Sequence, residues 1–78
     1  MVRRSPQVEA VLAALAAGPT YGLAIMRRTG LKSGTVYPIL HRMETAGWVN
    51  GARDEHTTAA GRPPRRVYQL TTRAPAHG

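Results

Sequence analysis

The change of hydrophobic period at Gly47 constrains the fold of this chain more than any other feature. Before Gly47, apolar residues recur three and four positions apart, which is the spacing of amphipathic helices. After it, the segment RRVYQLT at 65–71 alternates, with Tyr68 and Leu70 on one face of an expected strand. A chain of 78 residues buries only about 60% of its unfolded surface and has no room for a second core. We therefore expect one small domain in which helices precede a hairpin.

Three helices are predicted before Gly47, each bounded by a start and a stop signal. A serine or threonine stands at or just before the start of each segment and can accept a hydrogen bond from a free N–H of the first turn. A glycine follows each segment and readily ends a helix. The expected helices cover residues 6–17, 21–29 and 33–46, and their expected N-caps are Ser5, Thr20 and Ser33. Only about three residues connect the second helix to the third, as in a helix-turn-helix.

The third expected helix separates an apolar stripe from a polar face. At about 100° per residue, one face carries Val36, Ile39, Leu40 and Met43. The opposite face carries Thr35, Pro38, His41, Arg42 and Thr45, with Tyr37 at its border. Pro38 deletes one backbone hydrogen bond if Ser33 is the N-cap, and none if the helix is counted from Thr35. In either case its ring lies opposite the apolar stripe, so it is not expected to fill the core.

Three helices followed by a two-stranded hairpin describe a winged helix-turn-helix, a mainly α fold with a small β-hairpin. We expect a basic N-terminal arm over 1–5, the folded domain over 6–72 and a flexible tail over 73–78. The polar segment GARDEHTTAAGRPP at 51–64 would form an exposed loop in the wing. In such a domain the third helix enters the major groove of DNA, and the wing contacts the backbone or a neighbouring groove.

The charge of the chain independently points to a polyanion as the partner. Eleven Lys and Arg stand against four Asp and Glu, which gives a formal net charge of +7. Nucleic acid is the usual partner of such a chain, although an anionic membrane surface, or solubility alone, is an alternative. All but one of the cations are arginine, which suits phosphate and guanine, but GC-rich codons also favour arginine.

Other classes of protein are disfavoured by what the sequence lacks. No apolar run approaches the roughly 20 residues of a membrane span, so we expect a cytoplasmic protein with no membrane partner. There is no cysteine, and the three histidines at 41, 56 and 77 fall on a helix, a loop and the tail. We therefore expect no metal site, no cofactor and no enzymatic activity.

Three blocks of sequence occur in order along the chain. They are YGLAI at 21–25, LKSGTVYPILHRMETAGWV at 31–49 and GRPPRRVYQLT at 61–71. Together they resemble the PadR-type winged-helix transcriptional regulators, which implies a repressor-like protein that binds DNA and is not an enzyme. Members of that family usually dimerise through a long C-terminal helix packed with helix one, and some bind small aromatic compounds at that interface. Only about seven residues follow Thr71, so we expect no small-molecule ligand.

That departure from the family also bears on self-association. Without the C-terminal helix, a homodimer would have to use the alanine-rich side of helix one or the N-terminal arm.

The candidate DNA contacts fall into three groups. The first is the expected recognition helix, where residues at its start can hold a phosphate and residues one turn later can reach bases or phosphates. This group consists of Lys32, Ser33, Gly34, Thr35, Tyr37, Pro38, His41 and Arg42, in which the phosphate contact of Tyr37 is implied by the family resemblance. Pro38 is expected to touch a backbone sugar or a thymine methyl group. Ordinary capping, packing of Tyr37 and solvated charges are the alternatives.

The second group lies in the wing, and the third lies before the expected recognition helix, at Tyr21 and in the N-terminal arm. Arg62, Arg65 and Arg66 surround Pro63 and Pro64, and such arginines enter a minor groove or hold phosphates. Tyr21 would contact the DNA backbone from the start of the second helix or else pack in the core. Arg3 and Arg4 would form a basic arm or else a disordered tail.

The leading hypothesis is a sequence-specific regulator of transcription that binds double-stranded DNA, of the repressor type. A second hypothesis is an architectural or excisionase-like DNA-binding factor of a phage or mobile element. A third, of another class, is a winged-helix module that binds a protein through the face of helix three.

Overall fold

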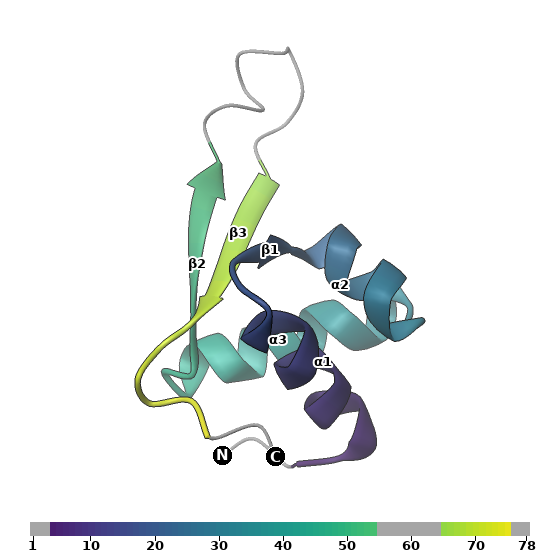
Figure 1. Cartoon of the computed structure of the whole chain (residues 1–78), viewed down its shortest axis with the longest axis horizontal. Helices are drawn as coiled ribbons and strands as arrows, with labels where there is room; N and C mark the ends of the chain where they lie inside the picture. Colours follow the sequence, from purple (N-terminus) through teal and green to yellow (C-terminus); the bar gives the residue numbers. More distant parts are fainter. Residues whose placement is uncertain (1–3, 55–64, 76–78) are drawn as a thin grey trace.

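The computed structural model describes residues 4–54 and 65–75, which form three helices and a small antiparallel sheet (Figure 1). The elements are α1 (Pro6–Ala16), β1 (Thr20–Tyr21), α2 (Gly22–Thr29), α3 (Ser33–Thr45), β2 (Val49–Asp54) and β3 (Arg65–Leu70). The sheet order is β1-β3-β2. The mainly helical class and the order of helices before hairpin are confirmed. The expected loop 51–64 is wrong at its start, because residues 51–54 continue strand β2 and pair with residues 65–68 of β3. The rest of that loop falls outside the described residues, and so do the ends of the expected arm and tail.

The core lies where the three helices meet the sheet. The apolar stripe predicted for α3 is confirmed, because Val36, Ile39, Leu40 and Met43 are all buried. They pack with Val8, Val11, Leu12, Ala14 and Leu15 of α1, Ile25 of α2, Val49 of β2 and Tyr68 of β3. Burying each large side chain of this kind contributes roughly 1.5–3 kcal/mol relative to exposure, although chain entropy offsets most of the sum. This packing fixes which face of α3 remains outside.

The cap expected for α1 is confirmed, but those expected for α2 and α3 are wrong. Ser5 Oγ accepts a hydrogen bond from the N–H of Val8 at 3.3 Å. The N-caps of α2 and α3 are Tyr21 and Lys32, and neither side chain makes a capping bond. At α3, the backbone carbonyl of Lys32 accepts from Thr35 and Val36, each at 2.9 Å. The helix therefore includes Ser33 as its first residue.

Thr20 does not cap α2 because the helix begins at Gly22, which makes Tyr21 the N-cap and leaves Thr20 one residue earlier, in the sheet. Thr20 pairs with Tyr68 and Tyr21 pairs with Val67, so β1 is a third strand beside the expected hairpin. Strand β3 consequently has a partner on each side, with β2 paired along its other edge from Val49 opposite Leu70.

The end of α3 is tied to the base of the hairpin. Gly47 adopts a left-handed backbone with φ of 82°, which favours glycine, and the N–H of Trp48 donates to the carbonyl of Met43 at 2.8 Å. Thr71 then returns to this turn. Its hydroxyl donates to the carbonyl of Gly47, and its N–H donates to the carbonyl of Trp48 at 2.9 Å. Two hydrogen bonds thus hold the chain that leaves β3 against the end of α3.

Candidate nucleic-acid interface

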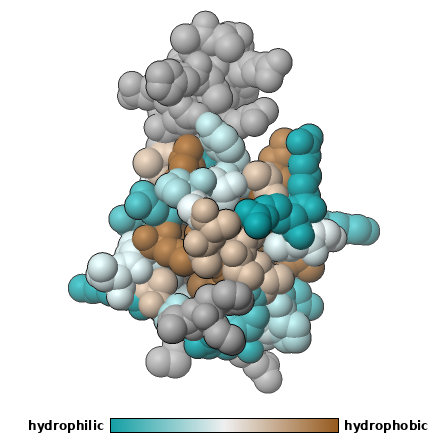
Figure 2. Space-filling view, viewed as in Figure 1, coloured by the Kyte–Doolittle hydropathy of each residue, from teal (hydrophilic) through white to brown (hydrophobic). Residues whose placement is uncertain are grey.

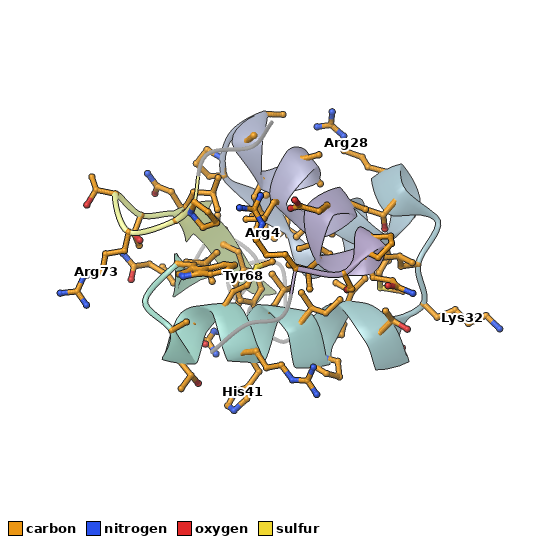
Figure 3. The ribbon with its side chains drawn as sticks, turned by 90° about the horizontal axis from the view of Figure 1, so that it is seen from below. Arg4, Arg28, Lys32, His41, Tyr68 and Arg73 are labelled. Carbon is orange, nitrogen blue, oxygen red and sulfur yellow. The ribbon has the colours of Figure 1, made fainter. Side chains whose placement is uncertain are left out.

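Helix α3 presents an uncovered polar face opposite its buried stripe. The exposed residues of this face are Ser33, Gly34, Pro38, His41, Arg42 and Thr45, and Thr35 is half-buried. Figure 3 shows His41 projecting from α3 away from the other helices, and Lys32 extending from the start of the helix. The structure therefore brings the predicted α3 residues together on one side of the molecule.

Pro38 occupies the sixth position of α3, counted from Ser33. It has no N–H, so the carbonyl of Gly34, four residues earlier, receives no helical hydrogen bond from it. Both residues are exposed, so water can satisfy that carbonyl and the lost bond costs less than it would in the core. Of the two alternatives for Pro38, the structure shows the one in which a backbone hydrogen bond of the helix is missing. Its ring lies on the uncovered face, as expected.

Tyr37 lies against the start of α2 rather than fully in solvent. A Cβ placed on Gly22 would stand 2.6 Å from Cε1 and 2.7 Å from Oη of the Tyr37 ring. Only glycine at position 22 therefore allows the ring to touch the α2 backbone. The residue is still 45% exposed. Tyr37 thus both packs α2 on α3 and keeps part of its ring at the border of the uncovered face.

Tyr21 is half-buried. It is the last residue of β1 and the N-cap of α2. Figure 3 also shows Arg28, at the end of α2, on the side of the molecule opposite His41.

Arg66 is the wing arginine whose side chain is described, and it contacts α3. Its Nη2 donates to Glu44 Oε2 at 2.7 Å and to the carbonyl of Gly51 at 3.1 Å. Its guanidinium also lies over the ring of Tyr68, 5.7 Å from the centroid. These contacts hold Arg66 between the hairpin and the end of α3. Arg62 and the side chain of Arg65 lie outside the described residues, as does Arg3.

The carboxylates of the described residues 4–52 are paired with arginine. Glu9 of α1 accepts from Arg4 at 2.7 and 3.1 Å, and Glu44 accepts from Arg66. No ion pair within the described part of the chain involves Lys32 or Arg42, which leaves the positive charge on the α3 face uncompensated. The face is therefore suited to an anionic partner.

Among the described residues, Tyr68 is the one whose pKa the fold shifts clearly. Burial raises the pKa of its phenol, while the nearby Arg66 guanidinium acts in the opposite direction and Glu44 adds to the increase. The phenol is kept neutral at physiological pH, so it supports Arg66 by its ring rather than by a charge.

A groove separates the start of α1 from the polar face of α3. It encloses about 360 Å³ and is lined by Ser5, Gln7, Val8, Gly34, Thr35, Pro38, Ile39 and Arg42. Four of these α3 residues were expected at the interface, whereas the α1 residues were not. Their proximity arises from the packing of α1 on α3, and no local pattern around Gln7 indicates it.

Within residues 4–54 and 65–75, no helix is long and apolar enough to cross a membrane. The same residues contain no group of three His, Asp or Glu side chains that could hold a metal ion.

A helix-turn-helix joined to a hairpin, with an uncovered polar face on the third helix, defines a winged-helix DNA-binding protein. The sequence matches the family model of the transcriptional regulator PadR-like family over residues 11–74. The chain belongs to this family, as the three sequence blocks indicated. A search of curated proteins returns no match.

Solved structures of other regulators share the fold. A PadR family transcription regulator from Clostridium difficile R20291 is 24% identical with a TM-score of 0.73, over 87% of this chain and 74% of that one. The PcaV transcriptional regulator from Streptomyces coelicolor is 26% identical with a TM-score of 0.70, over 90% and 46% of the two chains. A PadR-like transcription factor from Bacteroides fragilis is 25% identical with a TM-score of 0.68, over 85% and 65%. The chain thus spans between 46% and 74% of the length of these proteins.

Proposed function

We propose that this protein represses transcription by binding a specific site on double-stranded DNA through α3. The observation that carries the proposal is the uncovered face of α3, where Pro38, His41 and Arg42 are exposed and take no part in the core. Side chains of this kind fit a major groove, in which arginine recognises guanine and an apolar group contacts a thymine methyl. Membership of a family of transcriptional regulators supports the same function.

The remaining candidate residues are assigned by their position around α3. The start of α3, where the free N–H groups favour a phosphate, carries Lys32, Ser33, Gly34 and Thr35. Tyr37 borders α3 on the α2 side, Tyr21 stands at the start of α2, and both would contact the DNA backbone. Arg62, Arg65 and Arg66 would follow the wing to a neighbouring groove or phosphate. Arg3 and Arg4 would add a basic arm before the domain at 6–72, with a flexible tail at 73–78.

A homodimer is the expected assembly, because one recognition helix reads only a short site. The alanine-rich side of α1 is the surface proposed for it, with the N-terminal arm. Figure 2 shows moderately apolar surface, coloured tan, at the centre of the face on which α1 lies in Figure 1. Figure 3 places α1 on the side of α3 away from His41, so a dimer through α1 would leave both recognition helices open to DNA.

Selection of bound fragments from genomic DNA tests the proposal directly. We expect enrichment of one short motif, with half-sites about one helical turn apart if a dimer binds. For roughly six neutralised phosphates, the slope of log affinity against log salt should be about −5. Uniform, weak binding to every duplex, with no dependence on salt, would contradict the proposal.

Two further measurements test the mode of binding. Arg42→Ala should weaken specific binding and make the salt slope shallower, whereas Arg28→Ala, on the far side, should not. Light scattering of the protein with and without its site would give the stoichiometry, and a single bound monomer would rule out the dimer.

A further inference from the structure

We infer that the groove between α1 and α3 binds a segment of the DNA sugar–phosphate backbone, and that Gln7 of α1 is a DNA-contacting residue. The inference rests on the proposed function and extends its interface to a helix that the sequence did not indicate. The occupant of the groove is one strand of the duplex that α3 contacts.

The position of the groove is the first argument. Thr35 and Arg42 are seven residues apart on α3, which places them two turns apart along one edge of its polar face. Pro38 lies between them, on both the polar face and the groove wall. The groove is therefore continuous with the surface proposed to face DNA. A duplex seated on α3 would carry one of its strands along this edge.

The chemistry of the lining is the second argument. The exposed ring of Pro38 supplies apolar surface, which suits the carbons of deoxyribose, and the nearly buried Val8 and Ile39 complete the apolar lining. Gln7, Thr35 and Arg42 supply an amide, a hydroxyl and a guanidinium, each able to donate a hydrogen bond to a phosphate oxygen. The groove thus offers both apolar and donor groups, which suits a strand made of sugars and phosphates.

The distribution of charge is the third argument. Neither glutamate of the described residues lines the groove. Glu9 is paired with Arg4, and Glu44 is paired with Arg66 on the hairpin side of α3. Arg42 therefore sets the sign of the potential in the groove, and an anionic strand is favoured there.

The test compares charge changes at Gln7 with the same changes at Gln69, an exposed residue of β3 outside the groove. The probe is a fluorescein-labelled duplex that carries the site returned by genomic selection. Gln7→Glu should weaken binding about fivefold or more near 0.1 M salt, because a carboxylate would face a phosphate. Gln7→Lys should make the salt slope steeper by about 0.9, the value for one added phosphate contact. Gln69→Glu and Gln69→Lys should change affinity less than about twofold.

Helix stability separates binding from folding in this test. Gln7 is the second residue of α1, where an acidic side chain favours the helix and a basic one opposes it. Gln7→Glu should therefore leave the melting temperature unchanged or raised while it weakens binding. Gln7→Lys should do the opposite in both measurements. A loss of affinity caused by misfolding could not give these opposite signs.

A scan of single methylphosphonate substitutions along the duplex locates the contact. Replacement of one phosphate on each half-site should abolish the affinity that Gln7→Lys adds, because the lysine then has no charge to contact. Replacement of any other phosphate should leave that gain in place. If the wild type binds its site but Gln7 and Gln69 variants behave alike, the groove inference is wrong and the proposed function stands. If the wild type binds no duplex, the proposed function is wrong and this inference falls with it.

Discussion

Glu44, in the last turn of α3, and Arg66, on β3, form an ion pair of 2.7 Å that joins α3 to the wing. Their side chains are 32% and 50% exposed, so the pair contributes at most about 1 kcal/mol to stability. Its larger effect is on charge. Arg66 can contact a phosphate only in competition with Glu44, whereas Arg42 has no such competitor among the described residues.

The first prediction follows from this pair. Arg66→Ala should change the salt slope of DNA binding less than Arg42→Ala does, since part of the Arg66 charge is already neutralised. Glu44→Gln should release Arg66 and make the slope steeper by up to about 0.9. Anisotropy titrations over a range of salt concentrations measure both effects, with Gln69→Lys as a control for net charge. Equal effects of Arg66→Ala and Arg42→Ala, with none from Glu44→Gln, would show that Arg66 leaves Glu44 when DNA binds.

The second prediction concerns the contact of Gly22 with Tyr37. Gly22→Ala places a methyl group within 2.8 Å of the tyrosine ring, so the ring has to move, while alanine restricts the unfolded chain and so favours folding by roughly 0.4–1 kcal/mol. The two effects have opposite signs. We expect Gly22→Ala to stabilise the protein in a Tyr37→Ala background, and to be less favourable by about 1 kcal/mol or more when Tyr37 is present. Urea denaturation of the four proteins gives this coupling, and additive effects would refute the contact.

The third prediction concerns Pro38. Pro38→Ala restores an N–H that can donate to the carbonyl of Gly34, so the free energy of unfolding should stay equal or rise by roughly 1 kcal/mol. Removal of the ring from the uncovered face should nevertheless weaken DNA binding or change the preferred site. Thermal unfolding and selection on genomic fragments measure the two properties separately. An unchanged affinity and motif would reduce Pro38 to a residue of the helix backbone alone.

The fourth prediction concerns pH. Burial raises the pKa of Tyr68, so the folded state favours the neutral phenol relative to the unfolded chain. Its contribution to stability is therefore complete below the ordinary tyrosine pKa of about 10 and is lost as the pH rises through the higher folded value. Tyr68→Phe should remove this loss, so its free energy of unfolding should fall less between about pH 9 and 11. Parallel curves for the two proteins would mean that Tyr68 does not contribute to alkaline unfolding.

The sequence predicted those parts of the fold that depend on local periodicity. The buried stripe of α3 and the alternation around Tyr68 are properties of single elements, and both are confirmed. The caps assigned to Thr20 and Ser33 are wrong for a different reason. A hydroxyl near the start of a helix can cap it only if the backbone places that residue at the N-cap. At Thr20 the backbone conformation follows from pairing with Tyr68 in the sheet instead.

Strand β1 was not predicted because two residues are too short to show alternation. The contacts that shape the candidate interface were hidden for a related reason. Gln7 lies near α3 because α1 packs on α3, and Arg66 forms an ion pair with Glu44, which is 22 positions away in the sequence. Such pairs become visible only when the elements are placed in space.

Strand β3 is hydrogen-bonded on both edges at Val67 and Tyr68, to β2 on one side and to β1 on the other. Because β1 leads directly into α2, the base of the wing cannot tilt without breaking the bonds that hold the start of α2. If α3 and the wing both contact DNA, as proposed, this pairing opposes any change in the distance between them. A duplex whose grooves do not match that distance would have to bend, and sequences that bend easily would bind better.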